Sequence, residues 1–186
     1  MTEFTVRPLT AENWPALEAL FGRAGASNGC WCAYWRLGPR YRDRPREDNK
    51  RDLRRLAGSG QSPGLLAFSP DGDAAGWCSL APRGDLGWLA HTRYLAPVDD
   101  LAVWSVSCFY VRRAHRGQGV TDALLEAAAA AAASAAAPAL EGYPVDTDVP
   151  GHTRNTFTGT AAAFARRGFQ VVARRKADRP IMRLSL

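Results

Sequence analysis

The sequence has no apolar run of about 18 residues, the length that a membrane-spanning helix needs. Its start, MTEFTVRPLT, lacks the basic-then-apolar pattern of a secretory signal, so we expect a cytoplasmic protein without a membrane partner. No zinc-finger or RNP-type module is visible, so no nucleic-acid partner is expected. Cysteine is scarce, and in a reducing compartment its four copies are expected to be thiols: Cys30, Cys32, Cys78 and Cys108.

What is present is typical of a globular protein. The 186 residues are 46% hydrophobic and 23% charged, which predicts one domain over residues 1–186. The net charge of +6 is compatible with a small polyanionic ligand. Most basic residues are scattered, and we interpret them as solvated surface. The group at residues 112–116 is different, because it lies beside two glycines and a predicted helix start.

Apolar periodicity and turn residues predict the secondary structure. The predicted strands cover residues 4–9, 64–68, 74–81, 102–111, 139–145, 169–175 and 180–186. One predicted helix is capped by Thr10 and buries Trp14, Leu17, Leu20 and Phe21. Further helices are predicted at 47–56, 123–137 and 158–168, with a loop containing short helical pieces at 22–45 and a loop at 82–100.

The order of these elements predicts the fold class. Strand 102–111, helix 123–137 and strand 139–145 form a βαβ unit, whose two strands should be parallel. The hairpins on either side should be antiparallel. We therefore expect a single-domain α/β fold with a mixed, mostly antiparallel sheet. Simple alternation along strand 102–111 would place Ser105, Ser107 and Phe109 on one face and Val106, Cys108 and Tyr110 on the other.

The turn RRAHRGQGVT, after the most strand-like segment, has the chemistry of a phosphate site. Gly117 and Gly119 allow a close approach of backbone to a ligand, and arginines beside a helix N-terminus attract anions. It is not a P-loop, because no Gly-Lys pair is present. A Rossmann site is disfavoured, because Asp122 stands at the third glycine position and several strands precede the turn.

This turn resembles the coenzyme A motif of the GNAT superfamily of acetyltransferases, [QR]-x-x-G-x-[GA]. The motif reads Arg116-Gly117-Gln118-Gly119-Val120-Thr121 here, with Thr121 where Gly or Ala is usual. The preceding FYVRRAH, the following ALLEAA and the closing RRGFQVVARR also resemble the family. The predicted strand order fits the family along nearly the whole chain.

The resemblance implies an enzyme that transfers an acetyl group from acetyl-coenzyme A directly to a primary amine of a small molecule, such as an antibiotic or a metabolite. No metal is implied. The alternatives are a protein N-terminal or lysine acetyltransferase, or a coenzyme A-binding sensor without turnover. By position, the implied coenzyme contacts are Phe109, Val111, Arg112, Arg116, Gly117, Gln118, Gly119, Val120 and Thr121.

The acid–base groups are less well indicated. Direct transfer needs a neutral amine, hence a base. Glu141 is the best carboxylate inside the βαβ unit, and a solvated charge is an equally good interpretation of it. Many family members use a tyrosine as general acid at the position of Phe164, so that role is empty here. Tyr143 or Cys108 could substitute, although no motif aligns them.

The segment GCWCAYWR lies where the family builds its acceptor pocket, so Trp31, Tyr34 and Trp35 are predicted to line that pocket. A local hydrophobic plug is the main alternative. Half a metal site with Cys78 and Cys108 is disfavoured, because the Cys-x-Cys spacing is shorter than that of usual zinc sites. The sequence predicts neither the acceptor's identity nor the oligomeric state.

Overall fold

A computed structural model describes residues 3–186, so residues 1 and 2 of the predicted domain lie outside the description. Within residues 3–186, one sheet contains the strands β1 (Thr5–Pro8), β2 (Gly64–Phe68), β3 (Ala74–Pro82), β4 (Trp104–Val111), β5 (Ala139–Gly142), β6 (Gln170–Ala173) and β7 (Ile181–Ser185). The α-helices are α1 (Trp14–Phe21), α2 (Tyr34–Leu37), α3 (Arg46–Gly58), α4 (Gly87–His91), α5 (Val120–Ser134) and α6 (Ala161–Arg166). The predicted α/β class is confirmed.

The strand order in the sheet is β1-β2-β3-β4-β5-β7-β6, and only β4 and β5 are parallel neighbours. Their pairing is short, since it joins Trp104–Val106 to Leu140–Gly142. Beyond Val106, β4 continues to Val111 beside β3 alone. The second half of β4 therefore has an edge without a β5 partner, in the middle of the sheet.

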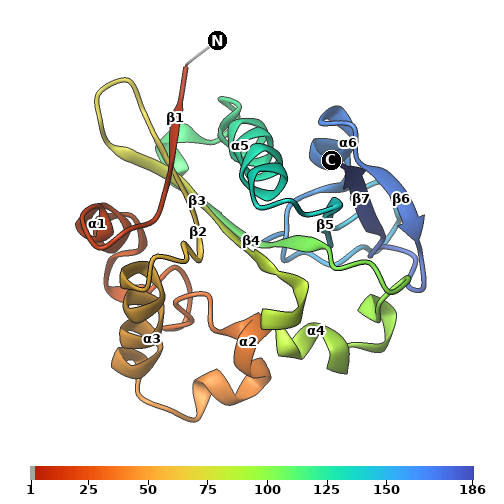
Figure 1. Cartoon of the computed structure of the whole chain (residues 1–186), viewed down its shortest axis with the longest axis horizontal. Helices are drawn as coiled ribbons and strands as arrows, with labels where there is room; N and C mark the ends of the chain where they lie inside the picture. Colours follow the sequence, from red (N-terminus) through yellow and green to blue (C-terminus); the bar gives the residue numbers. More distant parts are fainter. Residues whose placement is uncertain (1–2) are drawn as a thin grey trace.

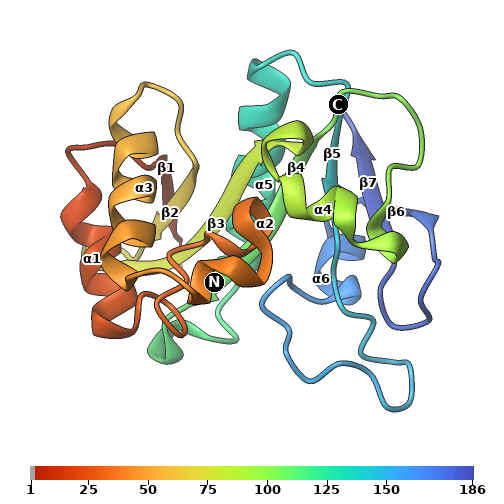
Figure 2. The same cartoon turned by 90° about the horizontal axis from the view of Figure 1, so that it is seen from below.

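The two faces of the sheet are covered by different helices (Figure 1). Helices α5 and α6 pack on one face, where the core includes Leu124, Leu125 and Phe164. Helices α1 to α4 lie on the other face, with Trp14 and Leu53 in one cluster and Leu89 in another. Figure 2 shows α1 and α3 together at one end of that face, with α2 and α4 nearer β4 and β5.

Helix α5 begins and ends earlier than the alanine run alone predicts. Gly119 precedes it with a φ of 90°, and Val120 is already buried in the core below. The helix ends at Ser134, four residues before Pro138, and Ala136 follows with a φ of 56°. The long alanine stretch forms a helix because Ala has the highest helix propensity. The resulting 15-residue helix starts directly at the glycine turn.

Two local predictions need correction. Helix α1 buries the four predicted residues, but it starts at Trp14, after Asn13, rather than at Thr10. The segment 82–100 is not a plain loop, because it contains α4 and short 3-10 turns at Arg83–Asp85 and Arg93–Leu95. These turns bury Leu89 and Leu95, and they are too short to give a helical period in the sequence.

A β-bulge at Ser107 overturns the expected alternation along β4. The register between β3 and β4 skips Ser107, which pairs with no residue of β3. A bulge turns the side chains that follow it to the opposite face. Val106 and Phe109 therefore face α5 together, while Cys108 and Tyr110 pack on the side of α1 and α3.

Candidate functional site

The glycine turn between β4 and α5 forms an open concavity at a helix N-terminus. Gly117 and Gly119 have φ values of 73° and 90°, in the left-handed region that favours glycine. A Cβ atom added at either position would meet no atom within 4 Å. The N–H groups of the first turn of α5 have no intrahelical acceptors, so they are available to an anion.

A cavity of about 640 Å³ extends from this turn along the free edge of β4. Its lining includes seven of the predicted coenzyme contacts: Phe109, Val111, Arg116, Gly117, Gly119, Val120 and Thr121. The other two do not line it. The Arg112 guanidinium lies 3.4 Å from the carbonyl oxygen of Ala19 in α1, and the Gln118 amide donates to the carbonyl of Ala114.

The cavity contains positive charge that sequence reasoning missed. Arg154, from the connection between β5 and α6, and Arg166, from α6, both line it. Arg166 forms a two-pronged ion pair with Asp122, with N–O distances of 3.2 and 3.0 Å, so the one carboxylate in the lining is compensated. The basic pair before Gly168 was the only available sequence signal, and nothing in the pattern placed α6 beside the start of α5.

A second cavity, of about 300 Å³, adjoins the first at the end of β4. The two cavities share Phe109, Tyr110, Asn155 and Phe157 in their linings. The rest of the second cavity comes from the segment 26–42 and from Cys108. A long and a small cavity thus meet beside the half of β4 that β5 leaves unpaired.

The aromatic segment GCWCAYWR divides between this second cavity and the core. Tyr34 and Trp35 line the cavity, and the Trp35 indole N–H donates to the carbonyl oxygen of the bulged Ser107 at 2.8 Å. Trp31 does not line it, contrary to the prediction. Its ring stacks on Trp14 at 5.8 Å and packs against Phe21, inside the hydrophobic cluster below α1.

The wall of the second cavity has an unusual backbone. Ala26, Asn28, Trp31 and Cys32 all have φ between 44° and 68°, although none is glycine. Such conformations are costly for residues with a Cβ, and they cluster at functional sites when the surrounding structure enforces them. Here the packing of Trp31 in the core fixes the segment, and its neighbours face the cavity.

The cysteines are thiols in this structure, and no disulfide links them. Cys30, Cys32 and Cys108 line the second cavity. Burial raises the pKa of Cys30 to about 11. A hydrogen bond with Cys108, together with burial, raises the pKa of Cys32 well above its usual value. Cys30 and Cys32 therefore carry their protons at neutral pH. Among residues 3–186, no group of three or more His, Cys, Asp or Glu side chains could hold a metal ion.

The connection from β5 to α6 closes the free edge of β4. The Phe109 N–H donates to the carbonyl oxygen of Phe157 at 2.6 Å. The connection is anchored further away, where Thr153 donates through its N–H and its hydroxyl to Asp178. The hydrogen bonds from Thr153 hold the pKa of Asp178 well below its usual range. Figure 2 shows this connection as an extended loop beyond the end of the sheet.

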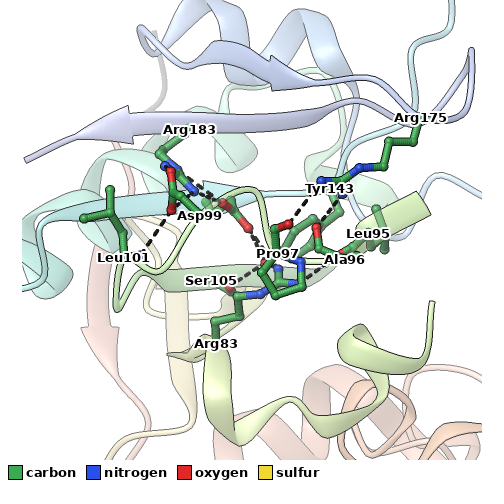
Figure 3. A network of polar contacts seen from close by, with 11 residues as sticks. Arg83, Leu95, Ala96, Pro97, Asp99, Leu101, Ser105, Tyr143, Arg175 and Arg183 are labelled. Carbon is green, nitrogen blue, oxygen red and sulfur yellow. Dashed lines mark hydrogen bonds and ion pairs between the residues drawn. The ribbon is translucent and has the colours of Figure 1, made fainter. Parts of the chain in front are cut away.

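Glu141, the predicted general base, lies in a different place, between Arg83 and Arg183. Figure 3 shows these two arginines in a network that also includes Tyr143. Glu141 is 1% exposed, and its carboxylate accepts hydrogen bonds from Arg83 at 2.9 Å and from Arg183 at 2.8 Å. The Tyr143 hydroxyl also donates to it at 2.9 Å. It lines neither of the two adjoining cavities. Both oxygens are engaged by cations on the side of the sheet away from α5, so this geometry does not support a general-base role.

The two other acid–base positions are also buried. Tyr143 is fully buried, its hydroxyl contacts that of Ser105 at 2.7 Å, and burial raises its pKa. Phe164 is fully buried, with its ring edge-on to Phe109 and Phe169. Only Cys108, of the substitutes considered, lies at the cavities.

The β4–β5 pair opens beside a glycine turn and a helix start, and comparison with known protein families identifies the family to which the chain belongs. A model described as "Acetyltransferase (GNAT) family" matches residues 26–150, which is more than half of the chain. The chain belongs to this family, as the sequence resemblance indicated. None of the helices described within residues 3–186 is long and apolar enough to cross a membrane.

Solved structures of the family have the same fold. The Escherichia coli GNAT family N-acetyltransferase YhbS, in complex with CoA, is 16% identical with a TM-score of 0.58, over 100% of this chain and 82% of that chain. A GCN5-related N-acetyltransferase from Kribbella flavida is 19% identical with a TM-score of 0.58, over 98% of each chain. The mosquito arylalkylamine N-acetyltransferase like 5b is 11% identical with a TM-score of 0.60, over 99% of this chain and 100% of that chain. At these identities the likeness shows the fold alone. A search of curated protein sequences gives no match.

Proposed function

We propose that this protein transfers the acetyl group of acetyl-coenzyme A directly to a primary amine of a small molecule. The observation that carries the proposal is the junction of the two cavities at Phe109 and Tyr110. One cavity is long and begins at an anion-binding turn, and the other is small and aromatic. An acyl donor and an acceptor in these cavities would meet beside the end of β4.

The residues of the long cavity fit coenzyme A. Its phosphates suit the N–H groups around Gly117 and Gly119, with Arg116, Arg154 and Arg166 nearby. Its pantetheine arm suits the edge of β4, where Phe109 and Val111 line the cavity and β5 no longer pairs. Coenzyme A supplies an activated thioester there. For the arm to pair with the Phe109 N–H, the carbonyl of Phe157 must leave that donor.

The chain's own groups then act chiefly by positioning. The aromatic cavity holds the acceptor next to the thioester and excludes water from it. The fixed Trp35–Ser107 contact holds the bulge of β4 at the meeting point. A dedicated acid for the departing sulfur is dispensable, because a thiol has a pKa of roughly 8.5 and its thiolate is a good leaving group.

A thiol-release assay tests this function. The protein is incubated with acetyl-coenzyme A and a panel of small primary amines and peptides, and the products are identified by mass spectrometry. We expect amine-dependent thiol release and an N-acetylated product, with little release when the amine is omitted. Tight binding of the coenzyme without release for any amine or peptide would instead indicate a sensor. Release with peptides alone would indicate protein acetylation.

A further inference from the structure

The charges around the small cavity bear on the kind of amine that it accepts. Its wall includes several aromatic rings: Tyr34, Trp35, Tyr41, Phe109, Tyr110 and Phe157. Tyr34 contacts three of these rings edge-on, with centroid distances of 4.7 Å to Trp35, 6.2 Å to Tyr41 and 6.1 Å to Phe157. Such interlocked rings make a preformed apolar slot, which suits a planar molecule of modest size.

The one charged side chain in this lining is a cation. Arg42 lies at the rim, where its guanidinium donates to the Tyr41 hydroxyl at 3.1 Å and stands 5.3 Å over the Tyr41 ring. The face of that ring is thus already used by a cation. A second cation, such as an alkylammonium group, would find no carboxylate in the described lining and would be repelled by Arg42.

Among residues 3–186, the lining of the small cavity contains no carboxylate or imidazole that could deprotonate an ammonium. Its titratable side chains within the described residues are three thiols, three phenols and the Arg42 guanidinium. Burial keeps Cys30 protonated, with a pKa of about 11, and Cys32 is likewise raised. A thiol that carries its proton is a donor rather than a base, so Cys30 and Cys32 do not serve as bases.

The proton acceptors of the long cavity belong to its phosphate end. Asp122 is in its ion pair with Arg166, and His115 stands edge-on to Phe4 at 6.1 Å, just before the glycine turn. Neither lines the small cavity. An acceptor that must lose a proton before attack has no partner for it there.

We propose, on the basis of the proposed function, that the acceptor is an arylamine, with its nitrogen bonded directly to an aromatic ring that carries an anionic substituent. The lone pair of such a nitrogen is shared with the ring, so the amine is neutral at neutral pH and attacks without prior deprotonation. The ring fits the aromatic slot, and the anionic group pairs with Arg42. The nitrogen forms a bond to the acetyl carbon, the carbon–sulfur bond breaks, and the proton released from nitrogen ends on the thiolate or in water.

A matched pair of substrates tests this proposal. para-Aminobenzoate and para-(aminomethyl)benzoate share the ring and the carboxylate, and differ by one methylene between ring and nitrogen. We expect efficient acetylation of para-aminobenzoate, with a kcat/KM that hardly changes from about pH 6 to about pH 9. For para-(aminomethyl)benzoate, kcat/KM should be low at neutral pH and rise about tenfold per pH unit, because only its neutral fraction reacts.

Variants separate the role of Arg42 from general charge effects. Arg42→Gln should lower the ratio of kcat/KM for para-aminobenzoate to that for aniline by about two- to fivefold, as expected for an exposed ion pair. Arg40→Gln makes the same charge change on the same 3-10 segment, outside the cavity lining, and should leave the ratio as it is.

The outcomes are distinguishable. The arylamine proposal is overturned if the enzyme acetylates para-(aminomethyl)benzoate or other alkylamines at neutral pH better than arylamines, or if their profiles level off at the pKa of a group on the enzyme. The proposed function survives in that case. Absence of transfer to every amine, with coenzyme binding intact, overturns the proposed function and the arylamine proposal together.

Discussion

The surroundings of Glu141 indicate a structural role, and this role can be distinguished from a catalytic one by experiment. It is buried between Arg83 and Arg183, which are themselves only 12% and 10% exposed. Glu141→Gln would leave two buried cations undercompensated, and we expect a loss of about 3 kcal/mol in the free energy of unfolding. Denaturant titration measures this loss, and calorimetry should give an unchanged affinity for acetyl-coenzyme A.

A neighbouring carboxylate serves as the control for Glu141. Asp99 also pairs with Arg183, but it is exposed, so Asp99→Asn should cost much less stability. The hydrogen bond from Arg183 lowers the pKa of Asp99 in the folded state. Its contribution is therefore present at neutral pH and fades as the pH falls through the range where the carboxyl is protonated. If Glu141→Gln abolished acetyl transfer at full stability, Glu141 would be a catalytic base after all.

Phe164 stands where the sequence resemblance places a general-acid tyrosine, and its side chain is fully buried. A Cβ added at Gly142 would lie 2.6 Å from the Cζ atom of Phe164, which shows how closely that ring tip is covered. Phe164→Tyr would bury a hydroxyl at this tip, and we expect a loss of about 1–3 kcal/mol in stability without faster transfer. A stable variant with a raised kcat would mean that the tyrosine hydroxyl reaches the thioester and that the acid role was open.

The connection between β5 and α6 must move if coenzyme A is to pair with the Phe109 N–H. Phe157 holds this connection over β4 in two ways. Its carbonyl oxygen accepts a hydrogen bond from the Phe109 N–H, and its ring packs beside Tyr34 and Trp35. Phe157→Ala removes the ring contacts, so the connection should release β4 more easily. We expect acetyl-coenzyme A to bind about two- to tenfold more tightly. This factor corresponds to the free energy of one hydrogen bond, because the Phe157 carbonyl would no longer compete with the coenzyme for the Phe109 N–H.

Isothermal calorimetry on this variant gives the answer. Val149→Ala is the matched control, because it lies in the same connection but lines neither cavity. Hydrogen exchange should also show that the Phe109 amide changes its acceptor when the coenzyme is added. Weaker binding by Phe157→Ala would instead make Phe157 part of the coenzyme site, and the idea of a competing contact would be wrong.

The elements that sequence predicted well are those set by local chemistry. The hairpin of β2 and β3, the helix after Gly119 and the apolar face of α1 each follow from neighbouring residues. The bulge at Ser107 was missed, because alternation in a sequence does not show where one strand carries an extra residue. That single residue changed which side chains of β4 face the cavities.

Across the chain, the glycine turn before α5 and part of both cavity linings, including Phe109, Tyr34 and Trp35, could be predicted from the sequence, whereas the way the cavities are assembled could not. The turn is contiguous, so its glycines and Arg116 could be identified together. The small cavity is assembled from residues 26–42, 108–110 and 155–157, which only the folded sheet brings together. The roles of Trp31 and Glu141 were predicted wrongly for the same reason. Their partners, Trp14 in the core and Arg183 in the arginine network, lie far away in sequence.

Binding of the phosphates of acetyl-coenzyme A by the turn at Gly119 can be tested by comparing three proteins. Calorimetry and thermal melting are measured with acetyl-coenzyme A for the parent, Gly119→Val and Gly72→Val. Gly72 has a φ of 86° and open space around its Cβ position, so it matches the backbone strain at Gly119 in an exposed hairpin turn. We expect the parent and Gly72→Val to gain about 2.7 kcal/mol of stability at a roughly hundredfold excess of ligand over Kd, and Gly119→Val to lose most of this gain. Equal coenzyme affinity in all three proteins would contradict the account.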